Sequence, residues 1–311
     1  MNKKLTFQKK IVLIAGPTAS GKSKIAILLA KKINGEIINA DSMQIYKDFS
    51  ILTSRPSKKD INEVKHHLYG IFSVKKYFST GDWLLLAKKE INQCIKKKKI
   101  PILVGGTGLY FNAITKGISK IPQITKKFRK KNRELHKKIG QKSFYEKLIS
   151  IDPICKIKIS SNDSQRTLRA YEVKMFTKKS LYEWSSNTKS DFLNYDIKKI
   201  FINSPREELL KKISKRTRAM FKDRCKEEVK KFLKLKIDKS LSANKIIGIS
   251  EIKDYLKGLI TLEKAVELVN IRTRQYAKRQ NTWSRGHMST WKKLYSKDFS
   301  VLTKKILKEI S

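Results

Sequence analysis

Acidic residues are scarce in this chain. Its 311 residues contain 27 Asp and Glu against 72 Lys and Arg, so the formal net charge is +45. A charge of this size is typical of proteins that bind a polyanion such as nucleic acid. It is also what a bias toward AT-rich codons produces, because only 13 of the basic residues are arginine and 59 are lysine. The net charge alone leaves both explanations open.

Cysteine is also rare, and the few cysteines are scattered. Cys94, Cys155 and Cys225 form no C-x-x-C pair, which argues against a disulfide framework and favours a reducing compartment. We therefore expect a cytoplasmic protein. The four histidines show no metal-ligand spacing, and the adjacent His66 and His67 are interpreted as structural residues.

Long hydrophobic runs are absent from the sequence. The first apolar run, Ile11–Ala15, is too short for a signal peptide and ends at a Gly-Pro pair. The longest uncharged stretch, Ile100–Thr115, contains a proline, three glycines and two threonines, so we do not expect it to span a bilayer. Apolar residues nevertheless make up 40% of the chain, which is enough for a folded core. We expect a soluble monomer with no membrane partner.

Three short apolar runs predict buried strands, at Ile11–Ala15, Glu36–Asn39 and Ile100–Val104. Helical patterns alternate with them, at about Lys22–Lys32 and Gly81–Lys99. This alternation is typical of parallel βαβ units. The sequence therefore predicts an α/β fold with a parallel sheet.

The middle of the chain has a different pattern. Between residues 122 and 198 the strand signal fades, and helical stretches such as Asp163–Phe176 dominate. A strand pattern returns at Lys199–Asn203, and the following Ser204-Pro205-Arg206-Glu207 predicts a helix N-terminus with a capping box. We therefore expect a core made of residues 1–121 and 199–311, interrupted by a helical insertion of residues 122–198.

The most specific motif is Gly16-Pro17-Thr18-Ala19-Ser20-Gly21-Lys22-Ser23, which fits G-x-x-x-x-G-K-[ST]. It lies between a predicted strand and a predicted helix, as a P-loop must. Backbone N–H groups of such a loop and of the helix N-terminus bind phosphate. Lys22 adds a positive charge, and Ser23 adds a hydroxyl ligand for Mg²⁺. The motif predicts a phosphate or diphosphate site and leaves the rest of the ligand open.

Polar segments follow the other two predicted strands. Asp41 lies at the carboxyl edge of the sheet, where parallel sheets bind ligands. Its position alone is compatible with a general base, with a Mg²⁺ partner through water, or with a helix N-cap. The segment Gly105-Gly106-Thr107-Gly108 allows close approach of the backbone to a substrate and offers a hydroxyl. A plain tight turn is the alternative interpretation.

Five motifs together closely resemble the tRNA dimethylallyltransferase family, also called tRNA isopentenyltransferases. They are GPTASGKS at 16–23, NADSMQIY at 39–46, ILVGGTGLY at 102–110, NDSQRTLRAYEV at 162–173 and AKRQNTWSR at 277–285. The resemblance extends from about residue 11 to residue 285, and the second and third motifs are specific to the family. It implies a P-loop NTPase-like core.

The resemblance also implies a reaction. Family members transfer a dimethylallyl group from dimethylallyl diphosphate to N6 of adenine 37, beside the anticodon, in tRNAs that read codons beginning with U. The P-loop then holds the diphosphate of the prenyl donor, with Mg²⁺ as cofactor. By match to the family, Asp41 is the general base, Thr107 lines the reaction channel and Arg216 binds the diphosphate.

An RNA surface is implied in the same way. The positions that match contacts with the tRNA anticodon stem-loop are Asp41, Ser42, Met43, Gln44, Thr107, Arg129, Gln165, Arg166, Thr167, Leu168, Arg169, Lys278, Arg279, Gln280, Asn281, Thr282, Trp283, Ser284 and Arg285. Six of the 13 arginines fall at positions matched to RNA or diphosphate, and we expect their guanidinium groups to contact phosphate or base. Without the family match, the segment at 277–285 is interpreted as a basic helix face with Trp283 in the core.

One segment departs from the family pattern. The family usually has an aromatic and a basic residue after the glycine of an I-G-Y-[KR] segment, whereas this chain has Ile249 and Ser250 after Gly248. We assign no RNA contact to that segment. The sequence has no C₂H₂ zinc-finger pattern, so it resembles the bacterial form of the family.

Other classes of function explain only part of these motifs. A small-molecule P-loop kinase accounts for the P-loop and Asp41, but for neither GGTGLY nor AKRQNTW. Prenyl transfer to free AMP is a close variant of the main hypothesis. A non-catalytic RNA-binding protein accounts for the charge but leaves Lys22, Ser23, Asp41 and Thr107 without a role. The sequence therefore favours tRNA prenyl transfer.

Overall fold

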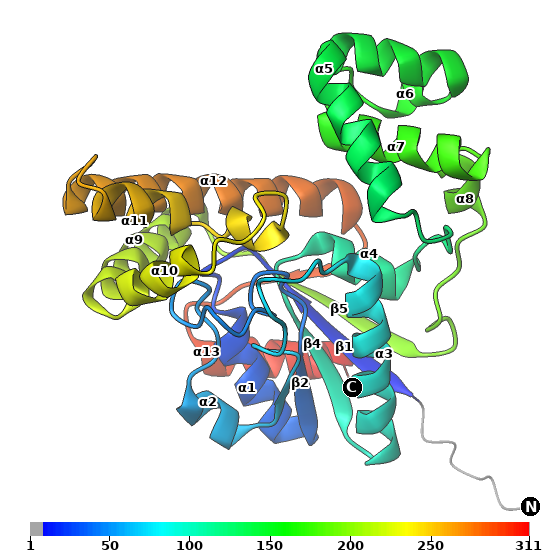
Figure 1. The fold of residues 1–311 in the computed structure, drawn as a ribbon. Coiled ribbons are helices and arrows are strands. Elements are labelled where there is room, and N and C mark those ends of the chain that lie inside the picture. The colour runs from blue at the N-terminus through cyan, green and yellow to red at the C-terminus, as the bar shows by residue number, and fades with distance from the viewer. Residues whose placement is uncertain (1–8, 311) are drawn as a thin grey trace, which may run out of the picture. The chain divides into compact units, whose positions relative to one another are not determined.

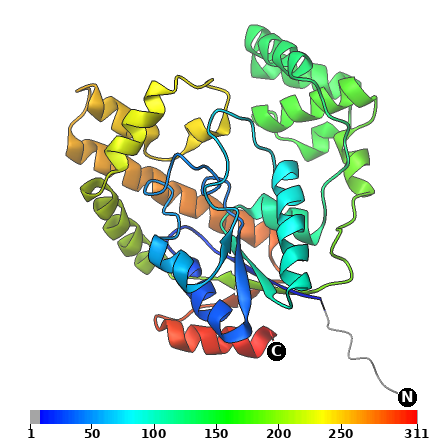
Figure 2. The same ribbon diagram turned by 60° about the horizontal axis from the view of Figure 1, so that its bottom comes forward.

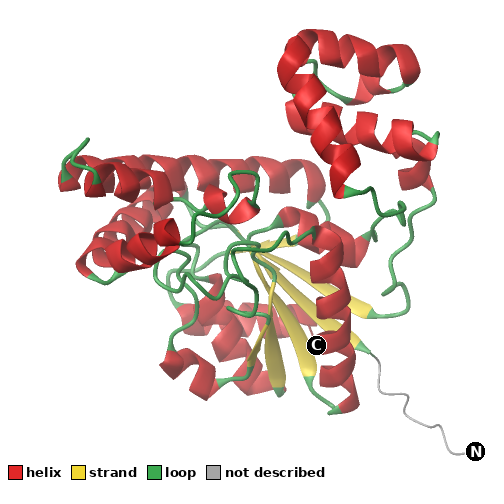
Figure 3. Cartoon of the chain, in the orientation of Figure 1, coloured by secondary structure: helices red, strands yellow, loops and turns green. Residues whose placement is uncertain are grey.

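The computed structural model describes residues 9–310. They form two compact units, of which the first falls within Met1–Ala113 and Asn194–Ser311 and the second is Ile114–Leu193. Figure 1 colours the chain along its length, and Figure 3 colours it by secondary structure. We call these parts unit 1 and unit 2 and describe each by itself.

A six-stranded, all-parallel sheet forms the centre of unit 1 in the described chain (Figure 3). Its order is β3-β2-β4-β1-β5-β6. The central strand β1 (Lys10–Ala15) pairs with β4 (Ile100–Gly105) and β5 (Asp196–Ile202), and β2 (Gly35–Asn39) pairs with β4. These strands are largely apolar because helices cover both faces of a parallel sheet. The predicted α/β fold is confirmed.

The two outer strands were not predicted. The strands β3 (His66–His67) and β6 (Lys292–Leu294) have only two and three residues, and most of these are polar. Edge strands of proteins are often short and polar, so they leave no apolar run in the sequence. The strand β6 interrupts the helices that follow β5.

Helices cover the sheet on both faces. On one face α1 (Lys22–Ile33) and α13 (Phe299–Ile310) bury Ile25, Leu29 and Ile306 against the strands, and Figure 2 shows these two helices side by side. On the other face lies α3 (Thr80–Lys96), which contacts β2 and β4. Its buried residues, Trp83, Ala87, Ile91 and Cys94, recur at helical spacing. Two short helices, α2 (Lys58–Glu63) and α4 (Gly108–Thr115), follow β2 and β4.

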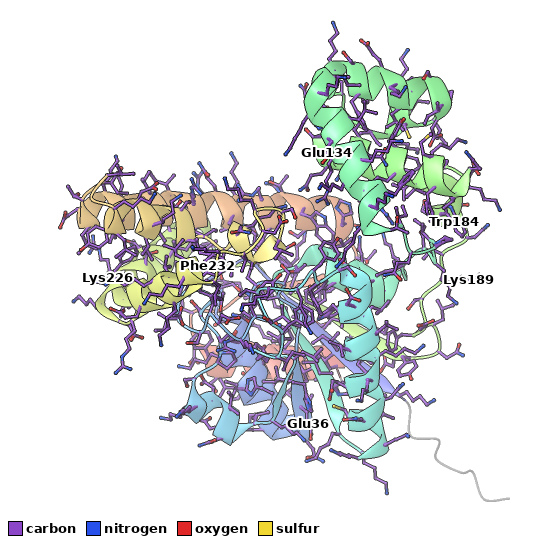
Figure 4. The ribbon with its side chains drawn as sticks, viewed as in Figure 1. Glu36, Glu134, Trp184, Lys189, Lys226 and Phe232 are labelled. Atoms are coloured by element: carbon purple, nitrogen blue, oxygen red, sulfur yellow. The ribbon has the colours of Figure 1, made fainter. Side chains whose placement is uncertain are left out.

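A further group of helices follows β5. It consists of α9 (Arg206–Lys222), α10 (Cys225–Lys234), the 3₁₀ turn Ser242–Lys245, α11 (Ile249–Leu256) and the long α12 (Leu262–His287). The helix α12 packs on α9 and α11. Phe232 of α10, labelled in Figure 4, is buried, with its ring centroid 5.1 Å from that of Phe49.

The predicted capping box before α9 does not form. Pro205 is the N-cap residue of α9, and no side chain caps the helix. The Ser204 hydroxyl instead donates to the carbonyl of Ser20, at 3.4 Å. Ser204 therefore ties the end of β5 to the P-loop.

Unit 2 is helical throughout (Figure 3). It contains α5 (Lys126–Ile151), α6 (Cys155–Lys158), α7 (Ser164–Thr177) and α8 (Leu181–Ser186). Phe144, Leu148 and Tyr171 are among the side chains of its small core. The indole N–H of Trp184, labelled in Figure 4, donates to the Thr177 hydroxyl at 3.0 Å and so joins α8 to α7.

No helix among residues 9–310 is both long enough and apolar enough to cross a bilayer.

The cysteines Cys94, Cys155 and Cys225 are buried as free thiols. Burial raises the pKa of Cys225 to about 11 and that of the other two to about 12. All three are therefore uncharged thiols near neutral pH.

Candidate active site

The P-loop connects β1 to α1 and curls tightly between them. Gly21 has a φ of +86° and Ala19 a φ of 65°, both in the left-handed region. A side chain at Gly16 would lie only 2.8 Å from the Ser20 hydroxyl oxygen. That hydroxyl is buried and has no hydrogen-bond partner among the described residues. The loop thus combines an anion-binding backbone shape with an unsatisfied polar atom.

Two partly buried cations, Lys22 and Arg216, lie beside the P-loop. The Lys22 ammonium donates to the carbonyl of Pro17 at 3.2 Å, and Nη2 of Arg216, from α9, donates to the Thr18 hydroxyl at 2.7 Å. Burial lowers the pKa of both side chains, that of Lys22 to about 8. The nearby carboxylate of Asp41 opposes this shift at each of them. The site therefore holds more positive than negative charge, as an anionic ligand requires.

Asp41 is positioned by a turn rather than by a helix. Its Oδ1 accepts the N–H of Met43 at 2.9 Å, and the next helix, α2, begins only at Lys58. The helix N-cap interpretation is therefore wrong. Its Oδ2 accepts no hydrogen bond from residues 9–310, so one carboxylate oxygen is left for a ligand.

Asn39 holds Asp41 in place, and sequence reasoning missed it. This fully buried side chain accepts the N–H of Asp41 at 2.8 Å and donates to the carbonyls of Asp41 and Leu68, both at 3.0 Å. In the sequence it is the first residue of the NADSMQIY motif and ends an apolar strand, but no role was assigned to it. Because it fixes the backbone on both sides of Asp41, it sets the direction of the carboxylate.

Close backbone approach explains the glycines of the GGTG segment. A Cβ atom on Gly105 would lie 1.9 Å from the carbonyl oxygen of Ala40, and one on Gly106 would lie 2.0 Å from Nε2 of Gln280. Between these glycines and α4, the Thr107 hydroxyl accepts the N–H of Ser42 at 2.9 Å. The segment thus packs against the Asp41 turn instead of forming only a tight turn.

Gln280 of α12 joins the P-loop to the GGTG segment. Its Oε1 accepts the N–H of Thr18 at 2.8 Å, and its Nε2 donates to the carbonyl of Gly106 at 3.0 Å. Sequence reasoning placed Gln280 among RNA contacts. In the structure its amide makes two internal bonds that hold the two loops at a fixed separation.

A cavity of about 270 Å³ lies between these loops and α12. The side chains of Phe111, Phe201 and Met288 are buried and line its inner part, whereas Leu109 and Arg279 are exposed. Sequence reasoning missed this lining, because single apolar residues outside a motif carry no functional signal. The cavity provides an apolar space next to a cationic phosphate loop.

The remaining candidate residues of α12 differ in exposure. Lys278, Arg279, Thr282 and Arg285 are exposed, Asn281 is partly buried and Ser284 is buried. Trp283 is only partly buried, so it is not a core residue. Its ring is stacked on that of His287, with centroids 4.4 Å apart and an angle of 4° between the planes.

The candidate residues of unit 2 lie on α5 and α7. Gln165 and Arg166 are exposed on the first turn of α7. Thr167 is buried and donates to the carbonyl of Asp163 at 2.7 Å, and Leu168 packs against the core of the unit. These last two side chains contribute to the packing of unit 2.

Two further arginines of unit 2 surround a buried carboxylate. The Arg129 Nε lies 3.8 Å from Oε2 of Glu172. Burial raises the pKa of Glu172, and the charges of Arg129, Arg133 and Arg169 oppose that shift. Arg129 and Arg169 therefore belong to one charged cluster on α5 and α7.

The segment that departs from the family pattern is engaged within unit 1. Ile249 is buried, and Gly248 before it has a φ of +105°. The Ser250 hydroxyl accepts from Nη1 of Arg272 at 3.0 Å, and Arg272 Nε lies 2.6 Å from Oε1 of Glu251. Arg272 of α12 thus contacts both Ser250 and Glu251 at the start of α11.

His67 belongs to a cluster outside this site. Its two ring nitrogens lie 2.6 Å from Glu36 and 2.8 Å from Glu90, and Cys94 donates to Glu36 at 3.6 Å. Ligand atoms of Glu36, His67 and Cys94 are close enough together to surround a metal ion. In the structure they bond to one another and so fasten β3 to β2 and α3. Glu36, labelled in Figure 4, is the second residue of β2, whereas Asp41 follows the other end of that strand, at Asn39.

Comparison with known proteins gives consistent matches. A family model described as IPP transferase matches residues 44–287. The tRNA dimethylallyltransferase of Pelagibacter ubique (strain HTCC1062) is 55% identical over 287 residues, which is 92% of each chain. That of Rickettsia massiliae (strain Mtu5) is 43% identical over 282 residues, covering 90% of this chain and 78% of the relative.

Solved structures agree with these matches. The full-length tRNA isopentenylpyrophosphate transferase of Bacillus halodurans superimposes with a TM-score of 0.67 at 33% identity, covering 97% of this chain and 94% of the other. A eukaryotic dimethylallyltransferase acting on tRNA gives a TM-score of 0.79 at 27% identity, covering 94% and 75%. The P-loop NTPase-like core expected from the resemblance is confirmed. Since both sequence and structure match over most of the length, the chain belongs to the IPP transferase family.

Proposed function

We propose that this protein transfers a dimethylallyl group from dimethylallyl diphosphate to N6 of adenine 37 in tRNAs that read UNN codons. One observation carries the proposal. Gln280 joins the P-loop to the GGTG segment, and an apolar cavity and the Asp41 turn lie next to these two loops. A prenyl diphosphate has an anionic head and an apolar tail, which fits a cationic loop next to such a cavity. The names of the relatives, tRNA dimethylallyltransferases, support the same reaction.

The diphosphate is proposed to bind at the P-loop. Negative charge grows on this leaving group as its bond to the allylic carbon breaks, so fixed positive groups stabilise the transition state. Lys22 and Arg216 are suited to this because they are partly buried and already held against the loop. The exposed hydroxyl of Ser23, in the first turn of α1, is a hard oxygen ligand of the kind that Mg²⁺ binds. Bound there, Mg²⁺ would neutralise charge on the diphosphate.

Asp41 is proposed to be the general base. The exocyclic amine of adenine is a poor nucleophile, because its lone pair is delocalised into the ring. A carboxylate that accepts a hydrogen bond from N6 orients the amine and takes its proton as the N–C bond forms. The Oδ1 atom is engaged with Met43, so Oδ2 is the oxygen available for this step. Thr107 holds the opposite side of the Asp41 turn through Ser42.

The RNA is proposed to bind along α12 and at unit 2. A base in a folded anticodon loop must leave its stack to reach a buried donor. Lys278, Arg279 and Arg285 of α12 and the exposed Gln165 and Arg166 of α7 have side chains suited to RNA backbone and bases. We propose that the insertion contacts the anticodon stem in this way and that the protein acts as a cytoplasmic monomer.

The test is incubation with labelled dimethylallyl diphosphate and an unmodified tRNA that reads a UNN codon, followed by mass analysis of its nucleosides. We expect one dimethylallyl group per tRNA, at adenine 37, and a requirement for Mg²⁺. The matched control is the same tRNA with guanine at position 37, which should stay unlabelled. Label on free AMP alone, or ATP hydrolysis stimulated by a small alcohol without RNA labelling, would refute the proposal in favour of its alternatives.

A further inference from the structure

The C-terminal end of α12 presents an aromatic surface next to the cavity. The Trp283 and His287 rings are parallel, with centroids 4.4 Å apart. A Cβ on Gly108 would lie 2.2 to 2.5 Å from three atoms of the six-membered indole ring, so Gly108 covers a face of Trp283. His287 is exposed. Its imidazole therefore offers the accessible aromatic face of the pair.

This pair is part of a groove. The residues that line it are Lys278, Arg279, Thr282, Trp283, Gly286 and His287, all from α12. Arg279 and Trp283 also line the cavity described above, so the groove and the cavity are neighbours. A Cβ on Gly286 would meet no atom within 4 Å, so nothing fills the groove above that residue.

The groove has the charge and chemistry of a nucleotide site. Residues 272–287 contain six basic or histidine side chains and no Asp or Glu, so their field favours a polyanion. His287 Nδ1 lies 3.0 Å from the carbonyl oxygen of Trp283, which places the proton on Nδ1 and directs Nε2 away from the helix. Unstacked bases bind proteins by stacking on aromatic rings while cations hold their phosphates.

We propose that this groove binds the nucleotide adjacent to the reacting adenine, with its base stacked on His287 and its phosphate at Lys278 or Arg279. The inference rests on the proposed function, because it takes the cavity as the place where the reacting base meets the prenyl group. We infer adjacency from the lining that the two places share: Arg279 and Trp283 border both the cavity and the groove, so the cavity and the groove are neighbours. The reacting adenine must leave the base stack of the anticodon loop. Stacking of the neighbouring base on His287 would prevent the two bases from stacking on each other again.

Two substitutions separate stacking from hydrogen bonding. His287→Phe keeps an aromatic ring but loses the N–H that bonds the Trp283 carbonyl, whereas His287→Gln keeps an N–H donor and loses the ring. Stacking of one base contributes about 1–3 kcal/mol, which corresponds to about 5- to 150-fold in Kd. We expect His287→Gln to weaken binding of an anticodon stem-loop within this range and His287→Phe to leave it close to the parent. The exposed Gln275, which does not line the groove, gives a control variant, Gln275→Ala.

Stem-loops that carry 2-aminopurine immediately 5′ or 3′ of the target adenine report the contact directly. Stacking on an aromatic ring quenches this base, so we expect quenching at one of the two positions with the parent and His287→Phe, and recovery with His287→Gln. Parent-like affinity and quenching in His287→Gln would overturn the proposal, and so would equal losses in both variants. Prenyl transfer by the parent protein is scored separately. A protein that labels no RNA but shows the expected pattern would refute the proposed function and leave the stacking site standing.

Discussion

Replacing Gly106 with alanine would put a methyl group where the Gln280 amide lies. The new Cβ would be 2.0 Å from Nε2 of Gln280 and 3.4 Å from the carbonyl oxygen of Gly16. Gly106 does not have a positive φ, so alanine fits its backbone conformation. The strain therefore falls on the Gln280 side chain, which must leave its position between the two loops.

The magnitude follows from the bonds that would be lost. Gln280 makes one hydrogen bond to Thr18 and one to Gly106. Each contributes about 0.5–1.5 kcal/mol, so together they hold the loops with about 1–3 kcal/mol. If this energy is expressed in the transition state, kcat/KM for prenyl transfer falls about 5- to 150-fold.

The assay is a double-mutant cycle of Gly106→Ala and Gln280→Ala, read as kcat/KM with saturating RNA. Because both changes break the same link, the double variant should be no worse than the poorer single variant. Gly81→Ala in α3 is the matched control, since its Cβ would meet only the Ser79 hydroxyl, at 3.5 Å. Losses that multiply in the double variant, or unchanged kinetics in Gly106→Ala, would show that the link does not support catalysis.

Three further predictions concern other parts of the molecule. Asp41→Asn keeps an Oδ1 acceptor for the Met43 N–H but no base, so kcat should fall about 10²- to 10⁴-fold while RNA affinity in a filter-binding assay stays at the parent value. Because the folded-state pKa of Lys22 is lowered to about 8, its ammonium is present below that pH and lost above it. Calorimetric affinity for inorganic diphosphate should therefore fall up to about tenfold per pH unit above 8, and Lys22→Arg should abolish this fall; a flat profile in the parent would contradict the assignment. Phe144→Ala removes a fully buried ring from the unit 2 core. The free energy of unfolding of that unit, measured in urea, should fall by about 3–5 kcal/mol, and by less only if the neighbouring side chains close the cavity.

Local patterns predicted most of the central sheet. The strands β1, β2 and β4 are buried along most of their length, and β5 is buried over its last three residues, so each contributes a short apolar run to the sequence. The P-loop was equally visible, because its spacing is set by contacts within eight consecutive residues. Short edge strands such as β3 have no such run, and their pairing depends on neighbours far away in the sequence.

The geometry around the motifs was not visible in the same way. A turn brings the Met43 N–H to Oδ1 of Asp41 and leaves Oδ2 open for a ligand. Asn39 can bond the Asp41 backbone because β2 ends at Asn39. Gln280 lies in a recognised motif, yet its bonds to Thr18 and Gly106 join segments that no local pattern connects. The capping box predicted at Ser204 failed for a similar reason, because the hydroxyl found a partner in the P-loop.

The link made by Gln280 also has a consequence for synthesis of the protein. Thr18 and Gln280 are 262 residues apart, and a ribosome adding about 5–20 residues per second needs roughly 13 to 50 seconds to cover that interval. During this time the P-loop exists without its bond to α12, and for the first part of it, until Ile202 has been added, β1 also lacks β5 as a neighbour. A nascent chain should therefore be unable to hold the prenyl donor in a reactive position, so the activity switches on only when the last long helix has left the ribosome.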